Sequence, residues 1–253
     1  MYAYLIGDLA AVAIFAFLFF VRKDLRKVMV YSGILYLALT TPCFFILKLL
    51  SSDAAKSVTP GYWSPPTLFN LGQRTGGLAI EDELFIFFAS AVVAGLYDYF
   101  FRVRVGGRTN KKMKRGHALL IGAIVGFAVF ALTPINAMYF LIILQFVGAA
   151  VLIVQRRDLL VNSLRGGLFF LVVYFALYSL FNRTFPSFVP DYYHLQRTTH
   201  ILIAGIPLEE CLYALSLGML WAPIYEYEHQ VKDKKRQKPG LRRLSLVVGG
   251  ARR

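Results

Sequence analysis

Two pairs of neighbouring acidic residues lie inside otherwise apolar stretches of the chain. The first pair is Glu81 and Asp82, and the second is Glu209 and Glu210. An ionisable side chain within a membrane span costs roughly 2.5 to 3.5 kcal/mol on insertion scales, so four such residues call for a functional explanation. Burial and a neighbouring carboxyl both favour the protonated form of a carboxylic acid. A protonated acid beside an ionised carboxylate could give one proton to an apolar substrate and remove another.

The aromatic residues that follow each acidic pair indicate a dry pocket rather than a path for ions. In a helix, Phe85 lies one turn after Glu81, and Tyr213 lies one turn after Glu209. Adjacent residues on a helix point about 100° apart, so the two acids of one pair cannot both face the same cavity. A transporter could use the same carboxylates as a proton relay, and the pattern alone does not separate the two uses.

Both acidic pairs belong to a sequence that occurs twice. Residues 77–99 return at one constant offset as residues 205–227. The sequence Arg-Lys-Asp-Leu that begins at Arg22 also returns, as Arg-Arg-Asp-Leu from Arg156. The duplication therefore extends beyond the acidic motif and predicts two tandem repeats of three spans each.

The composition predicts an all-α integral membrane protein. Hydrophobic residues make up 57% of the chain and aromatic residues 15%, and short charged stretches separate long apolar runs. A helix rises roughly 1.5 Å per residue, so each run can cross about 30 Å of hydrocarbon. We expect seven transmembrane helices, at residues 3–21, 28–50, 78–101, 116–134, 136–155, 163–182 and 200–225.

The basic residues predict the orientation in the cell membrane. Most of the 28 Lys and Arg residues lie at 22–27, at 102–115, at 156–165 and after residue 229, which are alternate loops. Short loops rich in Lys and Arg face the cytoplasm, so we expect the N-terminus outside. The net charge of +14 then reflects topology, and we expect no nucleic-acid partner because no soluble basic domain is predicted.

The repeats divide the chain into four parts. A three-span unit ends on the opposite side of the membrane from its start, so two units joined directly would be inverted. An extra fourth span between them makes the two repeats run parallel, related by a pseudo-twofold axis along the membrane normal. Both acidic pairs should then lie toward the outer ends of their helices and line one central cavity. The predicted parts are the first repeat at 1–101, a basic loop and linking helix at 102–135, the second repeat at 136–228 and a basic cytoplasmic tail at 229–253.

Each acidic pair follows a loop rich in aromatic residues and proline. Tyr62 and Trp63 lie in the first loop, and Tyr192 and Tyr193 lie in the second. One interpretation is that these rings mark the membrane interface, where Tyr and Trp gather. The other is that the loops cover the cavity and present aromatic faces to a cationic intermediate. The sequence leaves both interpretations open.

The paired motifs, the three-span repeat and the aromatic loops resemble the membrane-integral lycopene β-cyclase family. Its hallmark is Pro-x-Glu-Glu/Asp at the start of a span in each repeat, and the second copy carries it complete from Pro207 to Glu210. In the first copy Ala79 stands in place of the proline, and both acids are kept. The chain looks like the form in which two cyclase domains are fused, and the resemblance covers nearly its whole length.

The resemblance implies an enzyme of carotenoid biosynthesis, an intramolecular lyase or isomerase that turns the linear ends of lycopene into β-rings. A carboxylic acid protonates a terminal double bond, the carbocation closes a ring, and a base removes a proton, so we expect no cofactor and no metal. It also implies a bundle similar to that of membrane prenyltransferases, whose Asp-rich magnesium motifs are absent from this sequence. The implied partners are a carotenoid or other isoprenoid substrate, membrane lipid and other carotenoid enzymes.

On this basis the four acids are the candidate catalytic residues. We expect Glu81 and Glu209 to be the acid and the base, in an order that the sequence does not assign. Asp82 and Glu210 are expected to tune or anchor them. The candidate substrate-binding residues are Tyr62, Trp63, Phe85, Tyr192, Tyr193 and Tyr213.

Other polar residues are weaker candidates. Asp8 has no acidic counterpart in the fifth span; it could face the bundle or lie near the outer interface, and we favour the interface. Asp98 and Glu226 lie close to basic loops, where surface ion pairing is the better interpretation. The cysteines and histidines show no metal-ligand spacing.

Two other functions stay open at this point, a proton-coupled small transporter and a non-catalytic membrane partner protein. Against transport, each acidic motif begins its span instead of interrupting it midway, although Pro223 could kink the seventh span.

Overall fold

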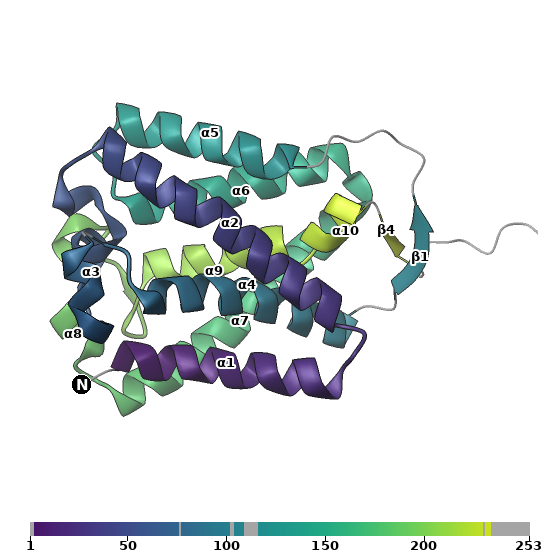
Figure 1. Cartoon of the computed structure of the whole chain (residues 1–253), viewed down its shortest axis with the longest axis horizontal. Helices are drawn as coiled ribbons and strands as arrows, with labels where there is room; N and C mark the ends of the chain where they lie inside the picture. Colours follow the sequence, from purple (N-terminus) through teal and green to yellow (C-terminus); the bar gives the residue numbers. More distant parts are fainter. Residues whose placement is uncertain (1–2, 76, 102–103, 109–115, 230, 234–253) are drawn as a thin grey trace, which may run out of the picture.

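The structure is a computed structural model that describes residues 3–75, 77–101, 104–108, 116–229 and 231–233. The predicted basic loop therefore lies mostly outside the described residues, and so does nearly all of the predicted tail. The described chain is almost entirely helical, and the long helices run side by side along one axis of the molecule (Figure 1).

Helices occupy all seven predicted positions. They are α1 (Ala3–Val21), α2 (Arg26–Leu50), α4 (Ile80–Phe101), α5 (His117–Leu132), α6 (Ala137–Gln155), α7 (Leu160–Thr184) and α9 (Leu208–Trp221), with α10 (Ile224–His229) after α9. Five of them, namely α1, α2, α4, α6 and the helix that ends in α7, are long and apolar enough to cross a membrane. This confirms an all-α integral membrane protein, while the count of seven crossings stays a prediction.

Short elements fill the loops. The loop before α4 contains short helical turns at Ala54–Lys56, Val58–Tyr62 and Leu68–Asn70 and the helix α3 (Leu71–Arg74), and the loop after α7 contains α8 (Phe188–Tyr192) and a turn at Leu195–Arg197. A further turn, Arg157–Leu159, precedes α7. Two small antiparallel sheets pair β1 (Arg104–Arg108) with β4 (Val231–Asp233) and β2 (Leu202–Ile203) with β3 (Ile206–Pro207).

The seventh predicted span differs from the structure at both ends. Its first residues form the β2–β3 hairpin, because Ala204 and Gly205 adopt positive φ angles of 51° and 81° and reverse the chain. The helix begins only at Leu208, directly after Pro207. At the other end Pro223, which cannot donate a backbone hydrogen bond, separates α9 from α10.

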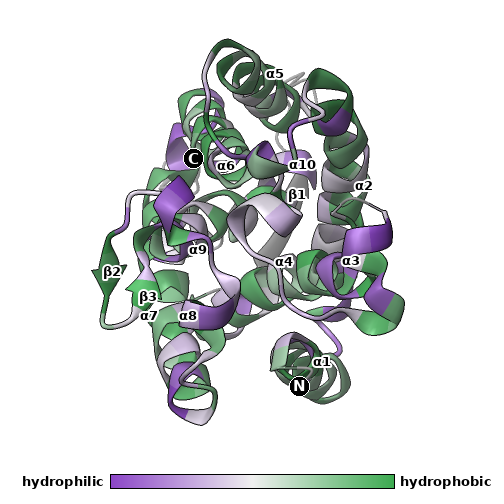
Figure 2. Ribbon diagram, turned by 90° about the vertical axis from the view of Figure 1, so that its left-hand side faces the viewer, coloured by the Kyte–Doolittle hydropathy of each residue, from purple (hydrophilic) through white to green (hydrophobic). Residues whose placement is uncertain are grey.

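The helices form two equivalent groups around a central pair. In the first repeat α1 and α2 both pack on α4, and in the second repeat α6 and α7 both pack on α9. The end-on view in Figure 2 shows α4 and α9 near the middle of the bundle and α5 at the rim, between α6 and α2. Both α4 and α9 begin at the same end of the bundle, the left end in Figure 1, as parallel repeats require.

Residues at equivalent positions of the two repeats lie at equivalent helix crossings, which agrees with the tandem repeat. Where α2 crosses α4, the Ser90 hydroxyl donates to the backbone oxygen of Ser32 over 3.2 Å. At the matching crossing of α7 and α9, a Cβ added at Gly218 would lie 2.5 Å from the backbone oxygen of Gly166. The equivalent rings of Phe85 and Tyr213 stack on each other with centroids 6.1 Å apart, at the centre between the repeats.

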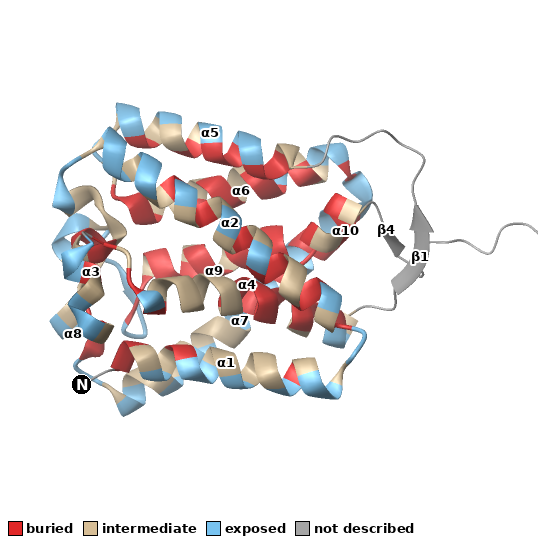
Figure 3. Cartoon of the chain, in the orientation of Figure 1, coloured by how far each residue is buried: buried red, intermediate tan, exposed pale blue. Residues whose placement is uncertain are grey.

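The buried positions lie mostly on the sides of the helices that face the middle of the bundle (Figure 3). Many of them are tyrosines, and their hydroxyls find partners inside the core. Tyr97 donates to Asn162 over 3.2 Å, and Tyr227 donates to Gln155 over 2.8 Å. A buried phenol needs such a partner because an unpaired hydroxyl in an apolar interior is costly. The polar positions of this core are therefore fixed by hydrogen bonds between helices.

Candidate active site

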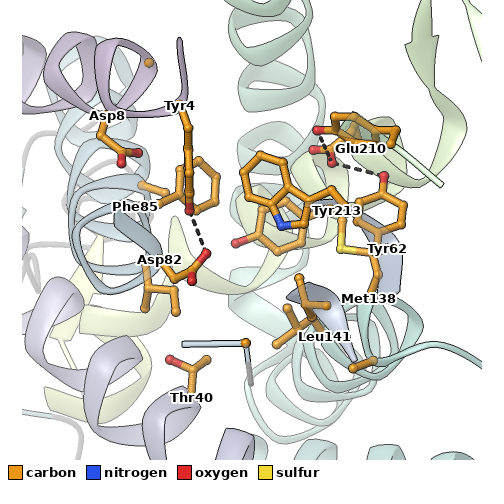
Figure 4. Close-up of a pocket in the computed structure, with 18 of the residues that line it drawn as sticks. Tyr4, Asp8, Thr40, Tyr62, Asp82, Phe85, Met138, Leu141, Glu210 and Tyr213 are labelled. Carbon is orange, nitrogen blue, oxygen red and sulfur yellow. Dashed lines mark hydrogen bonds between the residues drawn. The ribbon is translucent and has the colours of Figure 1, made fainter. Parts of the chain in front are cut away.

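A cavity of about 850 Å³ lies between the two repeats near the loop end of the bundle. Its walls come from α1, α2, α4, α6, α7 and α9 and from both aromatic loops (Figure 4). Aromatic and aliphatic side chains dominate the lining, and they include Phe85, Met138, Leu141, Phe170, Leu177, Phe181 and Tyr213. The cavity can hold an apolar molecule, and its few acidic groups stand out against these walls.

On one wall, three tyrosine hydroxyls surround the carboxylate of Glu210. Tyr62 and Tyr193 donate to Oε1 over 3.0 and 3.1 Å, and Tyr174 donates to Oε2 over 2.6 Å. Tyr174 comes from α7, and the other two come from the aromatic loops. Three donors aimed at one carboxyl favour its ionised form, because each hydrogen bond is stronger to the anion than to the acid.

On the opposite wall, Asp82 has a different set of neighbours. The Tyr4 hydroxyl on α1 donates to Oδ1 over 2.8 Å, and the backbone N–H of Ala79 donates to Oδ2 over 2.8 Å. The second bond caps the N-terminus of α4, because Asp82 accepts from the N–H of the residue just before the helix, as the acid of a capping box does. In the second repeat the residue that matches Ala79 is Pro207, which has no N–H to donate. Glu210 therefore does not cap its own helix, and it accepts hydrogen bonds from the tyrosines instead.

The first acid of each pair binds the loop that precedes its helix. Glu81 Oε1 accepts from the backbone N–H of Leu68 over 2.6 Å, and Glu209 Oε1 accepts from the N–H of Thr199 over 2.9 Å. The Tyr139 hydroxyl adds a 2.6 Å bond to the same oxygen of Glu209. Glu81 and Glu209 are fully buried, and neither is among the residues that line the cavity. We expected Glu81 and Glu209 to be the acid and the base. The geometry instead favours Asp82 and Glu210 for these roles, because these two line the cavity.

Five of the six expected substrate-binding residues line the cavity, namely Tyr62, Trp63, Phe85, Tyr193 and Tyr213. Tyr192 does not line it, and its ring packs against Phe188 with centroids 5.4 Å apart. Its backbone oxygen accepts from the N–H of Ser64 over 2.8 Å. Tyr192 therefore helps to join the two loops and does not face the space between the acids.

The two aromatic loops meet over the cavity. Trp63 and Tyr193 form an antiparallel β-bridge, and the N–H of His194 donates to the backbone oxygen of Tyr62 over 2.9 Å. The Trp63 ring also packs edge-on against Tyr4, with centroids 4.4 Å apart. The loops thus place aromatic rings beside both acids, as the lid interpretation requires.

The phenols of these loops keep their protons at neutral pH. Burial, followed by the nearby negative charge of Glu210, raises the pKa of Tyr62 well above its ordinary value. The same two causes raise the pKa of Tyr193. Both side chains therefore act as neutral hydrogen-bond donors.

A buried polar chain lies directly beneath the cavity. Tyr213 and Tyr36 share a hydrogen bond of 3.0 Å between their hydroxyls, and Gln145 donates to the Tyr36 hydroxyl over 2.8 Å. The Ser216 hydroxyl in turn donates to Gln145 over 3.0 Å. This chain ties α2, α6 and α9 together and fixes the ring of Tyr213.

Sequence reasoning missed several residues of the site. Tyr4, Tyr139 and Tyr174 each bind one of the four acids. Tyr4 and Tyr139 could have been found as tyrosines in the first turn of an apolar span, whereas Tyr174 lies in the middle of α7 and has no such signal. Asp8 was expected near the outer interface, but it is 2% exposed and lines the cavity. That expectation was wrong because the turn of α1 that carries Asp8 faces α4 instead of the lipid.

Asp98 and Glu226 also differ from expectation. They are 2% and 1% exposed, so both lie inside the bundle and not at the protein surface, while their expected ion pairing stays a prediction. Arg156 directly follows the last residue of α6, at the end opposite the cavity, and its Nη1 donates to the backbone oxygen of Glu226 over 3.3 Å. Within the described residues, no group of three His, Cys, Asp or Glu side chains is placed to hold a metal ion.

The comparison with protein families decides the identity. Residues 2–100 and 136–228 both match the family of lycopene cyclases, and together they cover most of the chain. The chain belongs to the lycopene cyclase family. No curated protein and no solved structure matches it.

The lycopene cyclase match agrees with the structure in two respects. The two matched segments are the two repeats, which confirms a fused tandem cyclase, and the unmatched part between them contains α5. A lycopene cyclase acts in carotenoid cyclisation, so the aromatic cavity between the repeats is its candidate active site. Glu81, Asp82, Glu209 and Glu210 all lie at or next to that cavity.

Proposed function

We propose that this lycopene cyclase forms β-rings at the linear ends of lycopene by a redox-neutral, proton-initiated reaction inside the membrane. The observation that carries the proposal is the placement of Asp82 and Glu210 on opposite walls of one aromatic cavity. A proton adds to the terminal double bond, a carbon–carbon bond closes the ring, and a ring carbon then loses a proton. The substrate has no polar group to hold, so an apolar cavity with only a few polar groups fits it.

The neighbours of the two acids support an order of proton transfer. Glu210 accepts three hydroxyl donors, which offset part of the cost of burying its charge, and it is therefore the better suited of the two acids to be the base. Asp82 accepts only two donors, from Tyr4 and Ala79, and a second carboxyl, that of Asp8, lines the same wall, so Asp82 is better suited to carry a proton. Asp82 is then the general acid, Glu210 the base, and Glu81 and Glu209 hold the loops in place.

The aromatic rings supply the remaining stabilisation. A ring face attracts a cation within about 6 Å of its centroid, and the attraction is worth roughly 2 kcal/mol where water is excluded. Phe85 and Tyr213 stack between the two acids, and Trp63 covers them from the loop side. The carbocation would therefore form next to π-faces instead of water, which could otherwise trap it as an alcohol.

The positive-inside pattern supports the proposed placement in the cell membrane. In the proposed orientation the acidic motifs lie near the outer face and the basic loops lie in the cytoplasm. The proposed partners are the carotenoid or another isoprenoid substrate, the surrounding lipid and other carotenoid enzymes, and no nucleic acid.

The test is pigment analysis of a lycopene-accumulating bacterial host that expresses the wild type or one of three variants. Asp82→Asn and Glu210→Gln are expected to abolish ring formation while the protein stays in the membrane. Glu209→Gln is expected to retain part of it, because the loop bond is weakened but the cavity acids are unchanged.

Two outcomes would contradict parts of the proposal. Full activity of Glu210→Gln together with an inactive Glu209→Gln would restore the assignment expected from sequence. Unchanged lycopene with the wild type, despite confirmed membrane expression, would point to another substrate, a transporter or a partner protein.

A further inference from the structure

A third carboxyl, that of Asp8, lies in the cavity beside Asp82. Asp8 is one helical turn after Tyr4, so the two side chains project from the same side of α1. The Tyr4 hydroxyl binds Asp82, and Asp82 and Glu81 both act electrostatically on Asp8. Figure 4 shows Asp8 and Asp82 on the same side of the cavity, with the Tyr4 side chain next to both.

The surroundings of Asp8 do not stabilise a negative charge. Its Oδ2 has no hydrogen-bond donor, and no cation pairs with the carboxyl, within the part of the chain that the structure describes. Of the α1 residues that line the cavity around it, only Tyr4 is polar, and the Tyr4 hydroxyl donates to Asp82. An ionised carboxyl buried without partners costs several kcal/mol, so the neutral acid is the stable form here.

The second repeat has no equivalent of this acid. The position that matches Asp8, at the offset that relates Arg22 to Arg156, is Ile142. The Asp82 wall thus has a spare carboxylic acid, whereas the Glu210 wall has three phenol donors. The Asp82 wall is therefore suited to supply protons, and the Glu210 wall is suited to a carboxylate that accepts one.

Each ring closure leaves the acid without its proton and the base with one. We propose that Asp8 is a relay residue that returns a proton to Asp82 after every cyclisation. The O–H bond of Asp8 breaks, an O–H bond forms on Asp82, and water at the loop end of the cavity re-protonates Asp8. Glu210 releases its proton to the same water, so the number of protons is unchanged over one cycle.

The loop end of the cavity is suited to this exchange with water. Exposed polar residues line the cavity there, and they include Lys48, Ser52 and Asp53. Asp8 lies in the second turn of α1, and α1 begins at the end of the bundle that carries the aromatic loops (Figure 1). The relay rests on the proposed function, in which Asp82 is the general acid.

The test compares first and later turnovers in lipid vesicles that contain the purified full chain. Lycopene is supplied first below one molecule per protein and then in excess, and ring formation is followed by pigment chromatography. Asp8→Asn is expected to form the first ring at the wild-type rate and later rings at least about tenfold more slowly. Asp8→Glu, which keeps a carboxyl, is expected to recover much of the later rate.

The matched control is Asp191→Asn, which removes an exposed carboxyl at the same end of the bundle but outside the cavity lining, and it should leave both rates unchanged. Wild-type rates in both regimes for Asp8→Asn would overturn the relay, and so would an equal loss in both. If Asp8→Asn fails to fold, Asp8→Ile, which copies the matching residue of the second repeat, is subject to the same two criteria. An active Asp82→Asn variant would instead refute the proposed acid, independently of Asp8.

Discussion

At the residue scale, small differences between the two motifs decide what each acid can do. Ala79 has an N–H that binds Asp82, whereas Pro207 has none, and the acid that follows it is free to face the tyrosines. Glu81 and Glu209 hold loop backbone in both repeats. One substitution at the start of a helix therefore changes the partners of a carboxyl three residues later.

The three donors to Glu210 give a prediction for Tyr174→Phe. This change removes the 2.6 Å bond to Oε2, and a hydrogen bond to a charged group is worth about 1.5 to 3 kcal/mol. The ionised base becomes less stable, so ring formation should fall by roughly 10- to 100-fold. The measurement is the rate of ring formation in vesicles. Tyr178→Phe is the control, because that hydroxyl binds Tyr193 and not Glu210, and an equal loss in both variants would count against the donors' role.

The buried phenol of Tyr62 predicts a loss of stability in alkali. Burial and the charge of Glu210 raise its pKa in the folded protein, whereas an unfolded tyrosine ionises near about pH 10. Its contribution is therefore complete below about pH 10 and is lost as the pH rises further. Thermal midpoints measured from about pH 8 to about pH 11 should decline less steeply for Tyr62→Phe than for the wild type. Identical slopes would show that this phenol does not titrate differently on folding.

At the element scale, close helix crossings hold each repeat together. The α7–α9 crossing requires glycine, since the backbones of Gly166 and Gly218 approach too closely for a side chain. The matching α2–α4 crossing is wider and holds Ser32 and Ser90. The two repeats thus share one architecture with different spacing.

This difference in spacing predicts unequal effects of two alanine substitutions. Gly218→Ala places a Cβ 2.5 Å from the backbone oxygen of Gly166 and should cost about 1 to 3 kcal/mol of stability through overpacking. Ser90→Ala removes only a hydroxyl and should cost about 1 kcal/mol or less. Thermal unfolding of both variants in detergent measures the difference, and a larger loss for Ser90→Ala would refute the argument.

The sequence predicts the helices well and the site less completely. Acids within apolar runs, the repeated motif and the aromatic loops all indicate one cavity between two repeats. The orientation of each acid depends on where its helix begins, and the β2–β3 hairpin shifts that start to Leu208. The partners Tyr4, Tyr139 and Tyr174 come from other helices, and no local pattern connects them with the acids.

At the scale of the whole molecule, α5 sets the relation between the repeats. It packs along α6 and reaches α2, and it turns the chain once more between two three-helix units. Without this helix the second repeat would enter the bundle upside down, and its acids would lie at the wrong end.

The role of α5 can be tested by cutting or shortening the chain. A chain cut between residues 109 and 115, with both parts expressed together, keeps α5 on the second part and should retain ring formation. Deletion of residues 116–134 from the intact chain should abolish it by inverting the second repeat. Pigment analysis with a reporter for the location of the C-terminus measures both effects, and an active deletion variant would disprove the role given to α5.

The unequal walls of the cavity also bear on how such a protein can evolve. In a dimer of identical subunits, every substitution appears on both sides of the axis, and an acid cannot gain a neighbour that its twin lacks. In one fused chain, each duplicate mutates alone. Asp8 opposite Ile142, and Ala79 opposite Pro207, are two positions at which the copies in this chain have diverged independently.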